Sequence, residues 1–346
     1  MLPLLEENVS LRPYNTFGLD VRARYFARFA SADELRQLLK RPQVQTAEKL
    51  ILGGGSNLLL TRDFAGVVLK NEIRGLEILR GDADQQTVLV RAGAGESWHG
   101  LVEYSLDQGL SGLENLSLIP GTVGAAPLQN IGAYGAELRD TFDHLEAVEL
   151  ATGVGRQFAG GDCGFGYRES VFKHGLKGQF VVTAVVLRLH RQARPNVRYG
   201  ASADTLAEMG IAGDPTPQDV SRAVVHIRRS KLPDPAQIGN AGSFFKNPEL
   251  SPAAFDRLKS QYPDLPGYPV PGGVKVPAGW LIEQAGWKGQ RRGPGPGTHG
   301  VHDRQALVLV NHGGATGSEL YALAEEIIAS VRQKFAIELH PEVNIL

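Results

Sequence analysis

This sequence contains one cysteine, Cys163, among 346 residues. A single cysteine excludes a disulfide within the chain and argues against a thiolate metal cluster. The sequence has no apolar run of the roughly 18 residues that a membrane helix needs, and its first 20 residues lack the basic start and apolar core of a secretory signal. We therefore expect a cytoplasmic protein with no membrane partner and no metal.

The sequence also lacks an excess of charge of either sign, with 36 Lys and Arg residues against 37 Asp and Glu residues. This balance argues against a basic surface that binds nucleic acid. The length predicts two or three domains of about 100–200 residues each. Glycine and proline, by contrast, are plentiful, at 42 and 20 residues. They predict a loop-rich α+β protein whose backbone approaches a ligand closely.

The most informative stretch is residues 50–60, in which a short apolar run ends in three glycines and a second apolar run follows. The first run is typical of a buried strand. Glycines allow a sharp turn whose backbone N–H groups bind an anion, and a serine and an asparagine add donors. The spacing is not the dinucleotide fingerprint, which opens a helix. Two interpretations stay open, a phosphate-binding loop between two strands and a tight turn without a ligand.

A second stretch, residues 112–135, is too rich in Gly, Ala and Pro for a surface helix and too apolar for a linker. Small residues allow the backbone to lie flat against a planar ligand. The alternative is a tightly packed cluster of turns. Two such stretches in one domain favour the ligand.

Hydrophobic periodicity and capping residues predict the remaining elements. We expect strands at residues 21–29, 88–92, 145–150, 180–189, 306–310 and 337–343. We expect helices at residues 31–39 and 98–106, from 217, around 279–285, and from 318, with a polar insertion at residues 194–214.

Taken alone, the candidate catalytic residues are ambiguous. Ser243 stands between Gly242 and two phenylalanines, where a serine is most often a turn residue, and the hydrolase pattern Gly-x-Ser-x-Gly is absent. Glu342 falls in the expected last strand, where a surface carboxylate is the default. The histidines at 144, 174 and 299 show no regular metal-ligand spacing.

Six motifs in order, however, resemble the UDP-N-acetylenolpyruvoylglucosamine reductases from about residue 12 to the end. They are Gly-Gly-Gly-Ser-Asn at 53–57, Ile-Pro-Gly-Thr-Val-Gly at 119–124, Gln-Asn-Ile-Gly-Ala-Tyr-Gly at 129–135, Phe-Gly-Tyr-Arg at 165–168, Asn-Ala-Gly-Ser-Phe-Phe-Lys-Asn at 240–247 and Pro-Glu-Val at 341–343. The chain departs from the family pattern at Ala125 and Ala126, where small Gly or Ser residues are common.

The resemblance implies an α+β architecture, with an FAD-binding fold of the vanillyl-alcohol-oxidase (PCMH) type in two subdomains and a C-terminal α/β substrate-binding domain. The expected boundaries are residues 1–71, 72–230 and 231–346. The Arg-Tyr-Gly at 198–200, inside an insertion at 192–215, is similar to the longer subtype of the family, in which a tyrosine, here Tyr199, closes over the substrate.

The resemblance also implies an activity, the reduction of UDP-N-acetylglucosamine enolpyruvate to UDP-N-acetylmuramate in the synthesis of bacterial peptidoglycan. A hydride passes from NADPH to FAD and then to the methylene carbon of the enolpyruvyl group. Ser243 protonates the adjacent carbon, while Arg168 and Glu342 act at the substrate carboxylate. FAD is expected to be non-covalent, because neither glycine-rich motif contains His or Cys to attach it. We expect a monomer.

The implied binding residues fall into two groups. FAD is expected to contact Gly53, Gly54, Gly55, Ser56, Asn57, Ile119, Pro120, Gly121, Thr122, Gly124, Gln129, Asn130, Gly132 and Ala133. The nucleotide sugar is expected to contact Tyr134, Tyr167, Arg168, Tyr199, Lys231, Asn247, Tyr268 and Lys288.

Two rival functions remain to be weighed. An oxidase of a hydroxy acid or lactone on the same FAD scaffold would need the 53–57 loop, but it has no reason to combine the 243–247 motif with Glu342. A non-catalytic flavin or nucleotide-sugar binder would need the pocket but neither Ser243 nor Glu342. Turnover of NADPH that depends on the enolpyruvyl sugar separates these functions.

Overall fold

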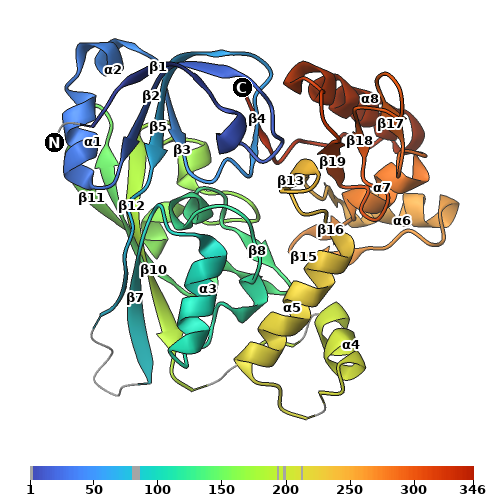
Figure 1. Ribbon diagram of the computed structural model, residues 1–346. Coiled ribbons are helices and arrows are strands. Elements are labelled where there is room, and N and C mark those ends of the chain that lie inside the picture. The colour runs from blue at the N-terminus through green and yellow to red at the C-terminus, as the bar shows by residue number, and fades with distance from the viewer. Residues whose placement is uncertain (1–2, 80–85, 193–194, 198–199, 212) are drawn as a thin grey trace. The chain divides into compact units, whose positions relative to one another are not determined.

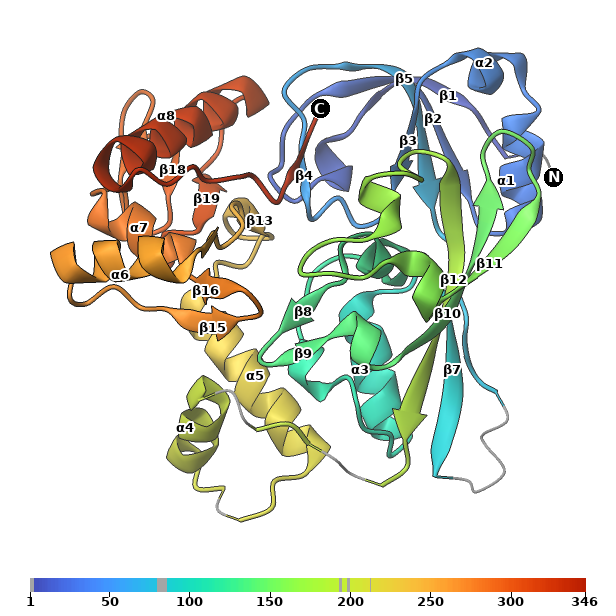
Figure 2. The same cartoon turned by 180° about the vertical axis from the view of Figure 1, so that it is seen from behind.

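The computed structural model describes residues 3–79, 86–192, 195–197, 200–211 and 213–346 (Figure 1; Figure 2 gives the opposite view). The chain divides into two compact units. The first, which we call the N-terminal unit, comprises Met1–Val9, Ala23–Gly54 and Ala65–Ser230; the second, the C-terminal unit, comprises Ser10–Arg22, Gly55–Phe64 and Lys231–Leu346. The chain thus passes from one unit to the other within the glycine loop, between Gly54 and Gly55.

The N-terminal unit begins with a four-stranded sheet in the order β1-β2-β5-β3, as predicted for the strand near residues 21–29. Helix α1 follows β2, and its N-cap Ser31 accepts a hydrogen bond from the backbone N–H of Glu34, as the sequence predicts. Strands β3 and β5 run parallel. The elements are β1 Glu6–Ser10, β2 Arg22–Phe29, α1 Ala32–Leu39, α2 Pro42–Thr46, β3 Lys49–Leu52 and β5 Phe64–Asn71.

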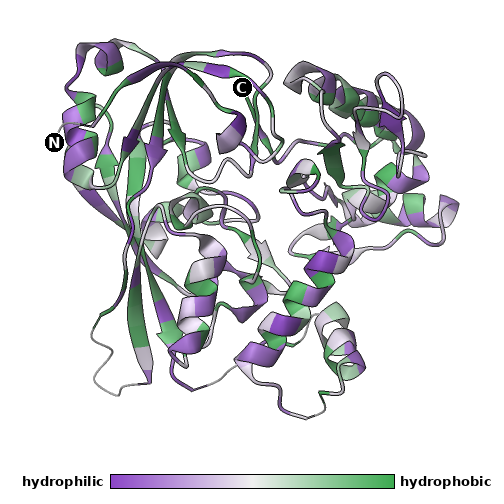
Figure 3. Cartoon of the chain, in the orientation of Figure 1, coloured by the Kyte–Doolittle hydropathy of each residue, from purple (hydrophilic) through white to green (hydrophobic). Residues whose placement is uncertain are grey.

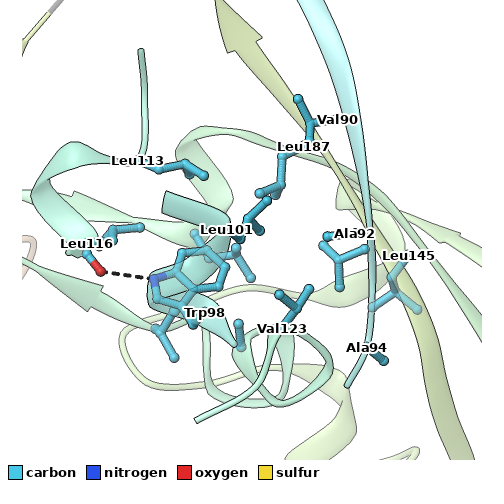
Figure 4. Packing of buried hydrophobic residues seen from close by; sticks show 14 of the residues in the cluster. Val90, Ala92, Ala94, Trp98, Leu101, Leu113, Leu116, Val123, Leu145 and Leu187 are labelled. Atoms are coloured by element: carbon cyan, nitrogen blue, oxygen red, sulfur yellow. Dashed lines mark hydrogen bonds between the residues drawn. The ribbon is translucent and has the colours of Figure 1, made fainter. Parts of the chain in front are cut away.

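The second sheet of this unit has five antiparallel strands in the order β11-β10-β12-β7-β6. Helix α3 and several short 3-10 helices contribute side chains to the same core, which is centred on the fully buried Trp98 (Figure 4). The elements are β6 Leu76–Ile78, β7 Thr87–Gly93, α3 Trp98–Asp107, η2 Glu114–Leu116, η3 Val123–Gln129, β8 Gly132–Ala133, β9 Ala136–Glu137, η4 Leu138–Asp140, β10 Phe142–Glu149, β11 Gly155–Ala159, η5 Gly160–Cys163, η6 Val171–Lys173 and β12 Phe180–His190.

Two further helices are α4 (Gly200–Glu208) and α5 (Pro217–Lys231). The start of α5 agrees with the sequence, whereas helix α4, inside the polar insertion at 194–214, was not predicted. The reason is tertiary packing: buried Leu206 joins a cluster with Val220, Ala223 and Val224 of α5. Leu206 is the one large apolar side chain of α4, among alanines and polar residues, and it gives too weak a periodic signal to predict such a helix.

The C-terminal unit contains a four-stranded antiparallel sheet in the order β13-β19-β18-β17 and a three-stranded sheet in the order β14-β16-β15. Strand β20 pairs in parallel with β4. The elements are η1 Arg12–Tyr14, β4 Leu58–Leu59, β13 Gly239–Ser243, β14 Glu249–Leu250, α6 Pro252–Gln261, β15 Tyr268–Val270, β16 Gly273–Lys275, α7 Ala278–Gln284, β17 Arg291–Arg292, β18 His299–Val301, β19 Val308–Asn311, α8 Gly317–Phe335 and β20 Asn344–Ile345.

The strand expected at residues 337–343 is wrong. Those residues are irregular apart from one isolated bridge between Pro341 and Phe245, and the strand proper is only Asn344–Ile345. One backbone hydrogen bond lies on each side of this bridge, from Lys246 to the His340 carbonyl and from Glu342 to the Phe244 carbonyl, and the pairing extends no further. Glu342 therefore lies in an irregular segment and not in a strand. Helix α8 starts one residue earlier than expected, because Thr316 and Glu319 form a capping box.

Strands and helices alike carry both hydrophobic and hydrophilic residues (Figure 3). Within the described residues, none of the helices is long and apolar enough to cross a lipid bilayer.

Candidate functional site

The two glycine-rich stretches meet in the N-terminal unit. A Cβ atom added to Gly53 would lie 2.3 Å from Oγ1 of Thr122, and one added to Gly54 would lie 2.8 Å from Cα of Gly121. Both distances are too short for a real Cβ contact: at Gly54 the neighbour is backbone, which would have to shift, whereas at Gly53 it is the Thr122 hydroxyl, which would have to rotate away. Residues far apart in the sequence thus form one closely packed backbone surface.

In the C-terminal unit, the rest of the glycine loop is held by its own neighbours. Gly55 has φ = 62°, and a Cβ atom there would lie 2.0 Å from the carbonyl oxygen of Tyr14. The side-chain amide of Asn57 donates to the carbonyl of Glu342 at 3.4 Å, and the carbonyl of Asn57 accepts from the backbone N–H of Asn344 at 3.2 Å. Ser56 is half-buried between them. The loop therefore supports the segment that carries Glu342.

The segment at residues 116–124 is bonded to the start of α3. Trp98 donates its indole N–H to the carbonyl of Leu116 at 2.9 Å (Figure 4) and its backbone N–H to the carbonyl of Gly121 at 3.1 Å. The backbone N–H groups of Val123 and Gly124 bond to the carbonyls of Glu96 and Ala94. Between these anchors, Ile119 is half-buried and Pro120 is exposed. The segment is therefore fixed at both ends and presents its middle outward.

Backbone strain is concentrated in the same region. Among the described residues, six non-glycine residues have positive φ, and four of them are Leu118 (57°), Asn130 (43°), Tyr134 (50°) and Arg168 (54°). Such conformations cost energy and persist where the surrounding structure enforces them, often at functional sites. All four fall within or next to the motifs that carry the predicted binding residues.

Asn130 links two of these motifs. It is fully buried, and its amide donates to the Glu137 carboxylate and to the Gly166 carbonyl, each at 3.0 Å. Its side-chain oxygen accepts from the backbone N–H of Arg139 at 3.1 Å. The Asn130 side chain therefore positions the loop. The preceding residue, Gln129, is half-buried at the end of η3.

The guanidinium of Arg168 lies beside the 130–132 backbone. It donates to the carbonyl of Gly132 and, at 3.5 Å, to that of Asn130, and it stacks 5.3 Å from the ring centroid of Tyr167. A Cβ atom on Gly132 would lie 2.9 Å from Nη1 of Arg168, so the glycine makes room for this cation. Ala133 follows Gly132 in β8, before the turn that contains Tyr134.

Sequence reasoning missed Arg228, which lies in the last turn of α5. Its Nε donates to the carbonyl of Leu118 at 3.1 Å, and it also donates to the Tyr134 hydroxyl. Burial lowers the pKa of Arg228, Tyr134 opposes that shift, and the nearby charge of Arg168 adds to it. Arg228 directly follows buried Ile227 in α5. This position next to the buried face of the helix could have indicated from the sequence that Arg228 contacts the interior.

In the C-terminal unit, Ser243 ends β13 at an irregularity in the ladder. Gly242 has φ = 69°, and its N–H bonds to the side-chain oxygen of Asn240 at 2.9 Å. Ser243 is exposed, whereas the next residue, Phe244, is fully buried. The carbonyl of Phe244 accepts from the backbone N–H of Glu342 at 2.8 Å. The fold therefore brings the two segments that carry Ser243 and Glu342 side by side.

The remaining predicted substrate residues are spread through the structure. Oδ1 of Asn247 accepts from the first N–H of α7, that of Ala278, at 2.9 Å. Tyr268 is 53% exposed in β15, and Lys288 lies 2.9 Å from the Glu283 carboxylate. Lys231 is exposed at the end of α5, and Tyr199 lies outside the described residues. No group of His, Cys, Asp and Glu suited to a metal occurs within the part of the chain that the structure describes.

Comparison with known proteins identifies both units. Residues 23–160 match the model of the FAD binding domain family, and residues 234–346 match that of the UDP-N-acetylenolpyruvoylglucosamine reductase C-terminal domain. The chain is 52% identical to the UDP-N-acetylenolpyruvoylglucosamine reductases of Burkholderia ambifaria (96% of this chain, 94% of the relative) and Pseudomonas aeruginosa (99% and 98%).

The crystal structure of UDP-N-acetylenolpyruvylglucosamine reductase (MurB) from Thermus caldophilus has the same fold, with a TM-score of 0.67, 24% identity and 99% coverage of both chains. This agreement confirms the fold class that the motifs predict. With half of its residues identical to those relatives over nearly its whole length, the chain belongs to the UDP-N-acetylenolpyruvoylglucosamine reductase family.

Proposed function

We propose that this chain reduces UDP-N-acetylglucosamine enolpyruvate to UDP-N-acetylmuramate for peptidoglycan synthesis, with non-covalent FAD as cofactor and NADPH as co-substrate. The observation that carries the proposal is the identity of 52% to reductases of this name over nearly the full chain. The family match of residues 23–160 to an FAD binding domain supports FAD as the cofactor, and this range includes both glycine-rich stretches.

The residues present suit FAD. Its pyrophosphate needs backbone donors that side chains do not block, and Gly53, Gly54 and Gly121 supply a surface with no Cβ atoms. The half-buried hydroxyls of Ser56 and Thr122 add donors. We assign the cofactor to these residues and to the other members of the predicted set: Gly55, Asn57, Ile119, Pro120, Gly124, Gln129, Asn130, Gly132 and Ala133. When bound there, FAD would supply the transfer of a hydride from NADPH to the enolpyruvyl methylene carbon.

The chain's own residues complete the reaction. Hydride addition leaves an enolate next to the substrate carboxylate, and the Ser243 hydroxyl gives its proton to the enolate carbon. A serine is a weak acid, but an enolate carbon is a strong base, so the transfer needs only the correct geometry. Arg168 supplies the positive charge that carboxylate binding and enolate stabilisation require. Glu342 acts at the same substrate carboxylate. Because these two adjacent carboxylates cannot both ionise at low cost, they must share a proton or be held by a cation.

For the nucleotide sugar, we assign binding to Tyr134, Tyr167, Lys231, Asn247, Tyr268 and Lys288 in addition to Arg168. We also propose that the chain belongs to the longer subtype, in which Tyr199 closes over the sugar. The protein acts in the cytoplasm as a monomer.

The test is a purification followed by a turnover assay. The protein should be yellow, and acid precipitation should release the flavin into the supernatant. Oxidation of NADPH should depend on the enolpyruvyl sugar and yield UDP-N-acetylmuramate. NADPH oxidation at the same rate without the sugar would support an oxidase, and a protein that cannot bind flavin would support a different function.

A further inference from the structure

We propose that neutral His99 is a positioning residue for FAD, because it holds the Leu118 peptide in place, and that protonation of His99 releases this peptide and weakens cofactor binding. The inference rests on the proposed function in one respect, the assignment of residues 119–122 to FAD. His99 belongs to none of the six family motifs and was not among the predicted site residues.

The geometry fixes the protonation state that the contact needs. The backbone N–H of Leu118 donates to Nδ1 of His99 at 3.0 Å. Nδ1 must therefore carry a lone pair, so that the ring is neutral and its hydrogen sits on Nε2. Nε2 lies 3.5 Å from the carboxylate of Glu103, one turn further along α3. The imidazole is 22% exposed, so protons from solvent can reach it.

Leu118 is the point in the segment that most needs support. It has φ = 57°, a conformation that leucine rarely adopts. Its N–H is held by His99, and its carbonyl accepts from Nε of Arg228 at 3.1 Å. We call this arrangement the Leu118 clamp. Trp98 holds the carbonyls of Leu116 and Gly121 on either side, and the clamp holds the residue that directly precedes Ile119 and Pro120.

Charged groups from two helices face the imidazole. Burial lowers the pKa of His99 below its ordinary value of 6.5; Glu103 on α3 opposes this shift, and Arg229 and Arg228 on α5 reinforce it. The neutral form is therefore the stable one in the folded protein at neutral pH. A second ring proton would turn the acceptor into a donor that opposes the Leu118 N–H.

The sign of the pH effect follows from linkage. Because the pKa is lowered in the clamped state, the clamp's contribution is complete well above pH 6.5. It decreases as the pH falls below 6.5 toward the lowered pKa, and it changes no further below that value. Flavin should therefore leave the protein faster in mild acid.

Two amide substitutions at His99 separate its role as hydrogen-bond acceptor for Leu118 from its protonation. In His99→Asn, the side-chain oxygen can occupy the place of Nδ1 and accept from Leu118, but it cannot be protonated in this range. In His99→Gln, the longer side chain places its amide nearer the position of Nε2 and loses the contact. The exposed histidine of α5, in His226→Asn, serves as the matched control for the loss of an imidazole.

The experiment measures the rate of FAD release from the holoenzyme, by the fluorescence of free flavin, at about pH 7.5 and about pH 5.5, on either side of the histidine pKa. Wild-type protein and His226→Asn should release FAD about three- to tenfold faster at the lower pH, the range expected for one hydrogen bond. His99→Asn should release FAD at about pH 7.5 at the wild-type rate, and it should keep that same rate at about pH 5.5. His99→Gln should release FAD at both pH values as fast as the wild-type protein does at the lower pH. Equal behaviour of the Asn and Gln variants, or wild-type release that does not depend on pH, would overturn the proposal.

Hydrogen exchange in the peptide that contains Leu118 distinguishes this outcome from failure of the proposed function. If the clamp exists but residues 119–122 do not contact FAD, His99→Gln will speed exchange of that peptide while FAD release stays at the wild-type rate. If exchange is the same in all variants, the clamp itself is wrong.

Discussion

The segment at 116–124 and the segment at 243–247 are built in opposite ways. The first is anchored by buried groups: Trp98 bonds two of its carbonyls, and Leu118 is held on both sides of its peptide. In the second, buried Phe244 and Phe245 hold the backbone, while Ser243 itself is exposed at the end of a strand.

This difference indicates how each region works. A surface that binds a long cofactor through its backbone requires the backbone conformation to be fixed, so positive φ values and glycines are concentrated there. A group that transfers a proton requires a polar side chain that substrate can reach, on a supported backbone. Changes in the first region should therefore alter cofactor affinity, and changes at Ser243 should alter rate with the cofactor still bound.

The largest expected effect is at Ser243. Ser243→Ala removes the proton donor and should reduce turnover by about 10²–10⁴-fold, the usual contribution of general acid catalysis. The bound flavin should remain at wild-type occupancy, because Ser243 is exposed and removing its hydroxyl leaves no buried gap. Ser243→Cys should recover part of the activity, since a thiol can also donate a proton. Steady-state kinetics on flavin-matched samples measures both, and loss of flavin from Ser243→Ala would break the comparison.

The next effect concerns the packed glycines. Gly54→Ala places a Cβ atom 2.8 Å from the backbone of Gly121. Relief of this overlap should cost about 1–3 kcal/mol and weaken FAD binding roughly ten- to hundredfold. Gly54→Asp should abolish binding, because it adds a negative charge where the pyrophosphate is assigned.

The control for this substitution is Gly100→Ala in α3, where the added Cβ atom would meet nothing closer than 3.5 Å. It should leave FAD affinity unchanged and stabilise the helix by about 0.5–1 kcal/mol. FAD titration of flavin-depleted protein gives the affinities. Equal affinities for Gly54→Ala and Gly100→Ala would show that the meeting of the two glycine stretches has no role in cofactor binding.

The smallest effect is expected at Asn247, which both caps α7 and is assigned to the substrate. Asn247→Ala should lower the free energy of unfolding by about 1 kcal/mol through loss of the cap. Asn247→Asp keeps an oxygen for the N–H of Ala278 and should keep the melting temperature, yet its charge should raise KM for the UDP-sugar. Thermal unfolding and KM measured on both variants separate the two roles, and an unchanged KM in Asn247→Asp would remove Asn247 from the substrate site.

The sequence predicted what local pattern controls. The capping pair Ser31 and Glu34 marked the start of α1, and the three glycines marked a loop between strands. It failed where distant packing decides, as in α4, whose helix depends on Leu206 meeting α5. It also failed at residues 337–343, where pairing with the 244–246 segment is limited to a single bridge at Pro341.

The candidate site divides in the same way. Ser243, Glu342 and the glycines stand in motifs that a resemblance to a family reveals. Arg228 and His99 do not, because they act on Leu118 from 110 and 19 residues away in the chain. No local spacing predicts such contacts, and only the folded backbone shows them.

The most direct test of the central claim, that binding and proton transfer belong to different regions, is a stopped-flow comparison of the two half-reactions in Ser243→Ala. We predict that NADPH bleaches the flavin absorbance at a near wild-type rate, because that step needs no acid at Ser243. Return of the absorbance on addition of the enolpyruvyl sugar should be slowed by at least about 10²-fold. If bleaching by NADPH is slowed while recovery with the sugar stays at the wild-type rate, Ser243 belongs to the cofactor side of the reaction and the account is contradicted.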